Sequence, residues 1–239
     1  MNKDIYTSAI YSVTLQVIIG IISIFGLFIK MRSEDLILNE LLLLETIVQF
    51  VEFTFYIWLI YNFSKINFNV TLIRYIDWFI TTPTMLFTIV AFMIYRNNIL
   101  DSNNDKEKEP TTLNNIISEN SLNLLYIFIA NACMLILGFL GEYNAIDRIL
   151  AFSSSSLFLF ASFYIIYKNY VLDDNLNKFV FWFNFILWCG YGIAYLYPIT
   201  TKNIAYNILD IFSKNINGLL LTIYILFLYA PSNKLFTLI

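Results

Sequence analysis

Charged residues are scarce in this sequence, and histidine is missing altogether. Only 13% of the 239 residues are charged and 59% are hydrophobic, whereas soluble domains average roughly 25% charged residues. The lack of histidine excludes histidine-based metal sites, Ser-His-Asp triads and a histidine proton acceptor. This composition predicts a polytopic membrane protein. We expect that it is not an enzyme and that it has no catalytic residues and no metal site.

Cysteine is rare as well. Cys133 and Cys189 both fall in apolar segments, and neither their spacing nor their surroundings indicates zinc or a disulfide framework. Basic patches and glycine-rich phosphate loops are absent, so nucleic acid is not an expected partner. The first apolar run is too long for a cleavable signal peptide and lacks a small-residue cleavage site.

Long apolar segments are what the chain has in abundance. Seven of them reach about 20 residues or more, the length needed to cross the hydrocarbon core. They cover approximately 6–29, 36–61, 72–95, 121–141, 147–168, 177–199 and 203–230. The polar stretch 97–119 predicts a solvated loop and not a second domain. We therefore predict an all-α membrane protein, one seven-transmembrane-helix bundle over residues 1–239.

Lysine and arginine in the loops predict the orientation of this bundle. The connections after segments 1, 3 and 5, together with the C-terminus, hold Lys30, Arg32, Arg96, Lys106, Lys108, Lys168, Lys178 and Lys234. The opposite side holds Lys3, Lys65, Arg148 and Lys202. The excess on the first side predicts that the N-terminus is outside and that the loop 97–119 is cytoplasmic.

The seventh segment carries a lysine at membrane depth. Asn203, Asn207, Asp210, Lys214 and Asn217 are spaced by 4, 3, 4 and 3, which predicts one face of one helix. Such a lysine costs roughly 2.5–3.5 kcal/mol on insertion scales, so Lys214 is a functional candidate with Asp210 as its counter-charge. A buried lysine can also lose its proton or form a Schiff base. A structural Lys–Asp pair is the alternative.

The second segment contains carboxylic acids within an apolar run. Glu45, Gln49 and Glu52 are spaced by 4 and 3, so they share a face that must point to the interior or to water. One interpretation is a pair of protonated acids that make structural hydrogen bonds. The other is a hydrophilic path, in which carboxylates favour cations over anions. In the first segment, Ser12 and Gln16 continue a polar stripe that suits helix packing or pore lining.

The third and sixth segments add a second carboxylate and an aromatic stripe. In RYIDWFITTPTMLFTIV, Arg74 and Asp77 lie one helical turn apart. In segment six, Trp188, Tyr191 and Tyr195 are spaced by 3 and 4. Such a stripe is usually core packing, but an interior lysine elsewhere in the bundle makes a cofactor wall the competing interpretation.

Three motifs together resemble microbial (type I) rhodopsins. RYIDWFITTP is similar to their helix-three signature, DIFSK to their helix-seven Asp-x-x-x-Lys, and Trp188-x-x-Tyr191 to their helix-six retinal wall. The order, spacing and segment count all agree, so the resemblance covers the whole chain. It implies all-trans retinal on Lys214 as a protonated Schiff base, with Asp77 as primary counterion and proton acceptor and Asp210 as second counterion.

The resemblance also assigns the surroundings of the retinal. Trp78 and Trp188 would sandwich the polyene, Tyr56 and Tyr191 would hydrogen-bond the second counterion, and Arg74 would shape the extracellular half. The other pocket residues that it implies are Thr81, Thr82, Met134, Gly138, Phe152, Ser155 and Tyr195.

Some positions depart from the proton pumps of this family. The usual carboxylic proton donor is replaced by Thr88, and the paired glutamates of a typical release group have no clear counterpart near Lys202. Glu52 instead stands where channelrhodopsins carry a pore glutamate, and Glu45 matches another glutamate of their helix two. With Asn residues flanking the lysine, this pattern resembles the group 1 rhodopsins of giant algal viruses, a family of light-gated cation channels.

We therefore expect a retinal-binding, light-gated cation channel. Thr82 and Asn131 occupy the positions of the channelrhodopsin gating pair. The path residues that we expect are Ser12, Glu45, Gln49, Glu52, Tyr56, Arg74, Asn131, Asn207 and Asn215. A weak outward proton pump and a photosensor with a separate partner protein are the alternatives. The expected partners are the lipid bilayer and the transported cations or protons, with a homo-oligomer left open; the plasma membrane of an infected host cell is our hypothesis for the location.

Overall fold

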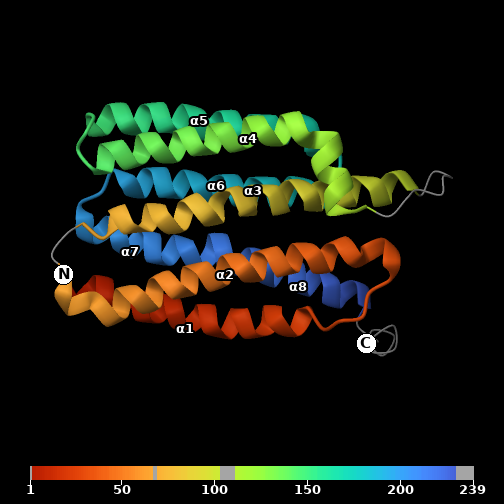
Figure 1. Cartoon of the computed structure of the whole chain (residues 1–239), viewed down its shortest axis with the longest axis horizontal. Helices are drawn as coiled ribbons and strands as arrows, with labels where there is room; N and C mark the ends of the chain where they lie inside the picture. Colours follow the sequence, from red (N-terminus) through yellow and green to blue (C-terminus); the bar gives the residue numbers. More distant parts are fainter. Residues whose placement is uncertain (1, 67–68, 103–110, 230–239) are drawn as a thin grey trace.

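The protein is an elongated bundle of rods that run side by side along its long axis (Figure 1). The computed structural model describes residues 2–66, 69–102 and 111–229. The rods in these ranges are α1 (Lys3–Gly26), α2 (Leu36–Asn62), α3 (Thr71–Ser102), α4 (Leu113–Glu142), α5 (Arg148–Tyr170), α6 (Asn175–Tyr195) and a last rod of α7 (Ile199–Asp210), a π-helical turn (Ile211–Asn215) and α8 (Ile216–Tyr229). The predicted all-α bundle of seven helices is confirmed.

Five of these rods are long and apolar enough to cross a membrane, namely α1, α3, α4, α5 and the last rod. Large apolar side chains cover the outer faces of the bundle, with Phe25, Phe50 and Leu157 among the most exposed. Buried polar groups lie between the helices instead. This inverted distribution is that of a bundle whose outer surface is solvated by lipid.

The helices differ from the predicted segments mainly at their ends. α3 continues to Ser102 and α4 begins at Leu113, so the loop predicted over 97–119 is wrong at both edges. The Thr112 side chain caps α4 by accepting a hydrogen bond from the backbone N–H of Asn115. Hydropathy marks only the part of a helix within the hydrocarbon, and polar turns that continue beyond it carry no apolar signal. The loop centre with Lys106 and Lys108, and the C-terminal Lys234, lie outside the described residues.

The last rod is not the single α-helix that the spacing predicts. The π-helical turn Ile211–Asn215 interrupts it and inserts one extra residue into the helical phase. Lys214 and Asn215, neighbours in the sequence, are therefore both buried. Asn217 is turned toward Asn184 on α6. The face predicted from α-helical spacing thus ends at Lys214.

The helices separate two kinds of interior. Figure 1 shows α4 and α5 along one side of the bundle and α1 along the other, with α3, α6 and the last rod between them. The side formed by α3 to α6 is filled by apolar and aromatic residues, including Phe163, Phe181 and Trp188. The side formed by α1, α2, α3 and the last rod holds Gln16, Glu52 and many of the other buried polar residues. The last rod lies where the two interiors meet.

Candidate cofactor site

Lys214 lies at the centre of the bundle with two carboxylates for neighbours. The residue is 1% exposed. Its Nζ contacts the Asp77 carboxylate on α3 and lies 3.7 Å from Oδ1 of Asp210 on α7. The π-helical turn directs the amine to this position. A lysine within the membrane needs such pairing, because an unpaired charge cannot be buried without a large desolvation cost.

Hydrogen bonds from three helices fix Asp210. Its Oδ2 accepts from the hydroxyl of Tyr56 at 2.8 Å and lies 3.0 Å from Nη1 of Arg74. Its Oδ1 accepts from the hydroxyl of Tyr191 at 2.7 Å. The structure thus brings both tyrosines to the carboxylate where the sequence places them. Because its oxygens already have these partners, Asp210 is held in one orientation.

Arg74 extends this network toward one end of the bundle. It is fully buried, and its guanidinium donates to the Tyr56 hydroxyl at 3.3 Å and to Oδ1 of Asn203 at 3.2 Å, and also contacts Asn207. With the ion pair to Asp210, these bonds join α3 to α2 and α7. A buried guanidinium is stable only when paired and hydrogen-bonded in this way.

A second polar cluster lies between α1, α2 and the π-helical turn. Glu52 accepts at Oε1 from Gln16 and at Oε2 from Asn215, both at 3.0 Å. Gln16 also donates to the Ser12 hydroxyl at 3.1 Å, and that hydroxyl donates to the backbone carbonyl of Asn207 at 3.1 Å. Four of the predicted path residues therefore meet in one hydrogen-bonded cluster.

Further along α2, Gln49 and Glu45 continue the row of buried polar residues, but their side chains contact different helices. The Gln49 amide nitrogen lies 3.4 Å from Oγ of Ser23 and 3.5 Å from the backbone oxygen of Asn215. Glu45 instead contacts Thr88 on α3. The polar residues of α2 share one buried face, as predicted, but this face meets different partners at its two ends.

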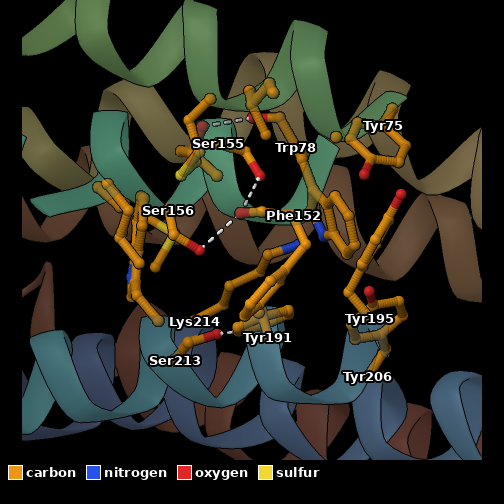
Figure 2. Close-up of a pocket in the computed structure, with 18 residues that line it drawn as sticks. Tyr75, Trp78, Phe152, Ser155, Ser156, Tyr191, Tyr195, Tyr206, Ser213 and Lys214 are labelled. Atoms are coloured by element: carbon orange, nitrogen blue, oxygen red, sulfur yellow. Dashed lines mark hydrogen bonds between the residues drawn. The ribbon is translucent and has the colours of Figure 1, made fainter. Parts of the chain in front are cut away.

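An aromatic cavity opens beside Lys214. Figure 2 shows the lysine side chain among Trp78, Phe152 and Tyr191. The predicted pocket residues that line this cavity are Trp78, Thr82, Met134, Gly138, Phe152, Ser155, Trp188, Tyr191 and Tyr195, with Lys214 itself. Thr81 does not line it; the Thr81 hydroxyl donates to the backbone carbonyl of Asp77 at 2.9 Å.

Several further residues line the cavity that the motifs did not point to: Tyr75, Met85, Leu135, Ser156, Leu159, Gly192, Tyr206 and Ser213. The rings of Tyr75 and Tyr206 meet Trp78 edge to face, with centroids 4.9 and 5.1 Å apart. Tyr75 precedes Trp78 by three residues, and Tyr206 precedes Asp210 by four. Helical spacing from the recognised residues is therefore the signal that would have found them.

Thr82 and Asn131 are in direct contact. The Asn131 amide donates to the Thr82 hydroxyl at 2.9 Å, and this hydroxyl donates to the backbone carbonyl of Trp78 at 2.8 Å. The bond ties α4 to α3 at the edge of the aromatic cavity. The pair therefore links the cavity wall to the helix that carries Asp77.

The sequence pattern did not predict another buried ion pair. Lys202, expected on an exposed connection, is buried in α7 and contacts Glu142 at the end of α4, which also contacts Asn69. A single glutamate thus faces Lys202, near which we expected no counterpart of the paired glutamates of a release group. The two residues are 60 positions apart, so no local pattern connects them.

The residues present fit a retinal. Lys214 supplies a primary amine for an aldehyde, the aromatic walls suit a polyene, and two carboxylates balance a cation on the linking nitrogen. The cavity holds about 100 Å³ with the lysine side chain extended into it. Small-molecule sites span roughly 300–1,000 Å³, so the cavity has to widen to hold a retinal, and its wall includes the flexible side chains of Met85 and Met134. Among the described residues, no group of His, Cys, Asp and Glu could hold a metal.

Comparison with known proteins agrees with this geometry. The family model described as bacteriorhodopsin-like protein matches residues 7–227. The crystal structure of the viral rhodopsin OLPVRII is similar at 25% identity and a TM-score of 0.79, over 95% of this chain and 99% of that one. No curated protein matches in a sequence search.

More distant structures share the fold alone. Acetabularia rhodopsin I is 14% identical with a TM-score of 0.73, over 96% of this chain and 97% of that one. The blue light-absorbing proteorhodopsin from Med12 is 19% identical with a TM-score of 0.66, over 93% of this chain and 96% of that one.

Proposed function

Because the chain belongs to the bacteriorhodopsin-like family of microbial rhodopsins, we propose that it is a light-gated cation channel with all-trans retinal on Lys214. Members of this family are integral multi-pass membrane proteins that bind retinal and use light for ion transport or sensing; they are not enzymes. We assign residues 1–239 to one retinal-binding domain. The channel proposal rests on the polar cluster around Glu52, beside the retinal site.

Different residues of the retinal site would balance the charge of the linking nitrogen and pack against the polyene. When bound, retinal supplies the absorption of light and a change of shape. Lys214 would hold it through Nζ as a Schiff base, and Asp77 and Asp210 would balance the positive charge. Asp77 is our proton acceptor, because its Oδ1 has no hydrogen-bond partner among the described residues. Trp78 and Trp188 line the cavity as the aromatic walls.

The channel proposal rests on three buried amide oxygens. Oε1 of Gln16, Oε1 of Gln49 and Oδ1 of Asn215 are buried without a partner in the described part of the chain. The amide nitrogens of Gln16 and Asn215 each donate to a Glu52 oxygen at 3.0 Å, and that of Gln49 lies 3.5 Å from the Asn215 carbonyl oxygen, which orients the three amides. Amide and carboxylate oxygens replace the hydration shell of a cation. A line of unused oxygens between α1, α2 and the π-helical turn therefore suits cations.

Glu52 is our candidate for the gate. Its two oxygens hold Gln16 of α1 and Asn215 of the π-helical turn at the same time. Asn215 directly follows Lys214, so a movement of the lysine backbone bears on this bond. While Glu52 bridges the two rods, the line between them is closed. Separation of Asn215 from Glu52 would free further oxygens for a cation.

One observation favours a second candidate, a weak outward proton pump. Thr88, which stands at the donor position of the pumps, contacts the Glu45 carboxyl. A carboxylic acid is therefore present there, although α2 supplies it and not α3. In this second function, Glu45 would donate a proton and Asp77 would accept one.

Whole-cell voltage clamp under illumination tests the proposal, with retinal supplied and the holding potential stepped. A current that reverses near the cation equilibrium potential supports the channel. An outward current of constant sign at every potential contradicts it and supports the pump. No current with a normal photocycle contradicts both and supports a sensor.

Two matched variants assign the current to the site. We expect Glu52→Gln to alter the size or selectivity of the photocurrent while the pigment keeps its colour, since Glu52 lies outside the aromatic cavity. Glu40 lies on the same helix but is exposed, so Glu40→Gln should change neither the photocurrent nor the colour of the pigment. Lys214→Ala should remove both pigment and current. Unchanged currents in Glu52→Gln would contradict the assignment of the gate.

A further inference from the structure

A second cavity, of about 300 Å³, lies between α3, α6 and α8. It shares no lining residue with the cavity beside Lys214. At its outer rim Phe179, Ile223 and Phe227 are 52%, 51% and 84% exposed on the lipid-facing surface. Its inner end is formed by buried polar residues of α2, α3 and α6. The cavity therefore leads from the lipid toward the interior of the bundle.

Asn184 and Asn217 at the inner end have no free hydrogen-bond donors. Their side chains bond to each other in both directions, at 3.3 and 2.8 Å. The second amide hydrogens go to the backbone carbonyls of Val180 at 2.9 Å and Ser213 at 2.7 Å. All four amide hydrogens are used, so the pair offers only acceptor oxygens to the cavity.

Glu45 is the other polar group at this end. It is 3% exposed and lines the cavity. One carboxyl oxygen contacts Thr88, whereas Oε2 has no hydrogen-bond partner among the described residues. A buried oxygen without a hydrogen-bond partner has an unfavourable free energy until a donor reaches it. The inner end therefore offers several acceptors to a ligand, and a ligand that fits it must bring a hydrogen-bond donor.

We propose that this cavity binds a single-chain aliphatic alcohol from the bilayer. Its hydroxyl donates to Oε2 of Glu45, and its alkyl chain lies along the apolar walls of Phe92, Phe183 and Leu220. A volume of about 300 Å³ is at the small end for ligand sites and has room for one alkyl chain. An alkane lacks the donor, and a fatty acid places a second carboxyl group against Glu45. The site does not depend on the proposed channel activity.

Photolabelling of the full-length, retinal-loaded protein in lipid nanodiscs tests the site. The probe is a diazirine analogue of 1-octanol, and mass spectrometry maps its adducts. We expect adducts on α6 and α8 at the cavity that excess 1-octanol suppresses. 1-Methoxyheptane has a similar length but no donor, and we expect it to compete about two- to tenfold less well. Adducts spread evenly over lipid-facing residues, or equal competition by the two compounds, would overturn the proposal.

Three variants keep the test specific. Leu220→Trp fills the cavity and should abolish the suppressible adducts. Leu226→Trp, on the lipid-facing side of the same helix and outside the cavity, should leave them unchanged. Glu45→Leu should erase the preference for the alcohol over the ether. Retention of pigment absorbance confirms the fold of each variant, and persistence of the preference in Glu45→Leu would refute the role of its carboxyl group.

Discussion

The two sides of Lys214 are built from opposite chemistry. Toward α1 and α2 the interior consists of amides, carboxylates and the Arg74 guanidinium, each held by several hydrogen bonds. Toward α4, α5 and α6 it consists of rings, such as Phe163, whose centroid lies 5.8 Å from that of Phe181 and 5.5 Å from that of Trp188. In a polar interior each lost partner leaves a buried group unsatisfied, whereas an aromatic interior depends on volume and shape.

This difference predicts different responses to substitution. On the polar side, loss of one partner leaves other groups buried and unsatisfied, so the cost spreads beyond the residue that was changed. On the aromatic side, loss of one polar contact leaves the packing intact. The following three variants test this contrast in order of decreasing effect.

Arg74→Gln should cause the largest loss of stability on the polar side. The substitution removes the nearer of the two cations beside Asp210 and leaves only Lys214, whose Nζ is 3.7 Å from Oδ1; breaking such a buried pair costs about 3–5 kcal/mol. We expect a loss of this size in the free energy of unfolding, measured by denaturation in sodium dodecyl sulfate with the pigment absorbance as readout. Arg96→Gln is the control on the same helix; it pairs with Asp174 near the end of the bundle, partly exposed, and should cost less. Equal losses in the two variants would contradict the contrast.

Asp35→Asn tests the hydrogen bonds at one end of the polar side. Asp35 precedes α2 and accepts hydrogen bonds from Tyr95, Tyr229 and Arg32. Hydrogen bonds to a charged group contribute about 1.5–3 kcal/mol, and we expect a loss within or below this range in the same assay. Glu34→Gln, next to it but exposed, should have a negligible effect because surface ion pairs contribute little.

The pH dependence of that loss follows from the same contacts. Burial opposes ionisation of Asp35, but the hydrogen bonds from Tyr229, Tyr95 and Arg32 outweigh it and hold the pKa of its carboxyl below the ordinary 3.8. A lowered pKa contributes stability that is complete above the ordinary pKa and is lost as the pH falls through the folded-state value. The wild-type protein should therefore lose its advantage over Asp35→Asn only below about pH 3.8. A difference that vanishes already at neutral pH would argue against the charge.

Asn131→Ala should have the smallest effect, because it removes one hydrogen bond on the aromatic side. Interhelical hydrogen bonds within membranes average about 0.6 kcal/mol. We expect a loss of this order in the free energy of unfolding, since the aromatic packing around the bond remains. A loss comparable to that of Arg74→Gln would show that Asn131 belongs to a polar network as demanding as that of α2.

The sequence predicts contacts that local spacing encodes and misses those that depend on the fold. The spacing of Asp210 and Lys214 puts the carboxylate near the amine in any regular helix. The contact between Glu142 and Lys202 joins residues 60 positions apart, and that between Glu45 and Thr88 joins residues 43 apart. Neither leaves a periodic trace in the sequence. Both arise only when the helices pack.

The π-helical turn is a third feature that spacing cannot show. Its residues, IFSKN, carry no periodic signal for a π turn. Asn217 donates to the Ser213 carbonyl within it, and Asn184 of α6 braces Asn217 in turn. A sequence interpretation that assumes 3.6 residues per turn therefore follows the rod correctly up to Lys214 and then loses its phase.

This turn also limits how the gene can vary. Lys214 and Asn215 are joined by a single peptide bond, yet one contacts Asp77 on α3 and the other donates to Glu52 on α2. Deletion of one codon within 211–215 would remove the extra residue and close the turn into an ordinary α-helix, so Lys214 and Asn215 would lose their present directions. The pigment site and the polar line would then lose their alignment in the same event. Insertions and deletions accepted in surface loops should therefore be purged from these five codons, even where each residue tolerates replacement.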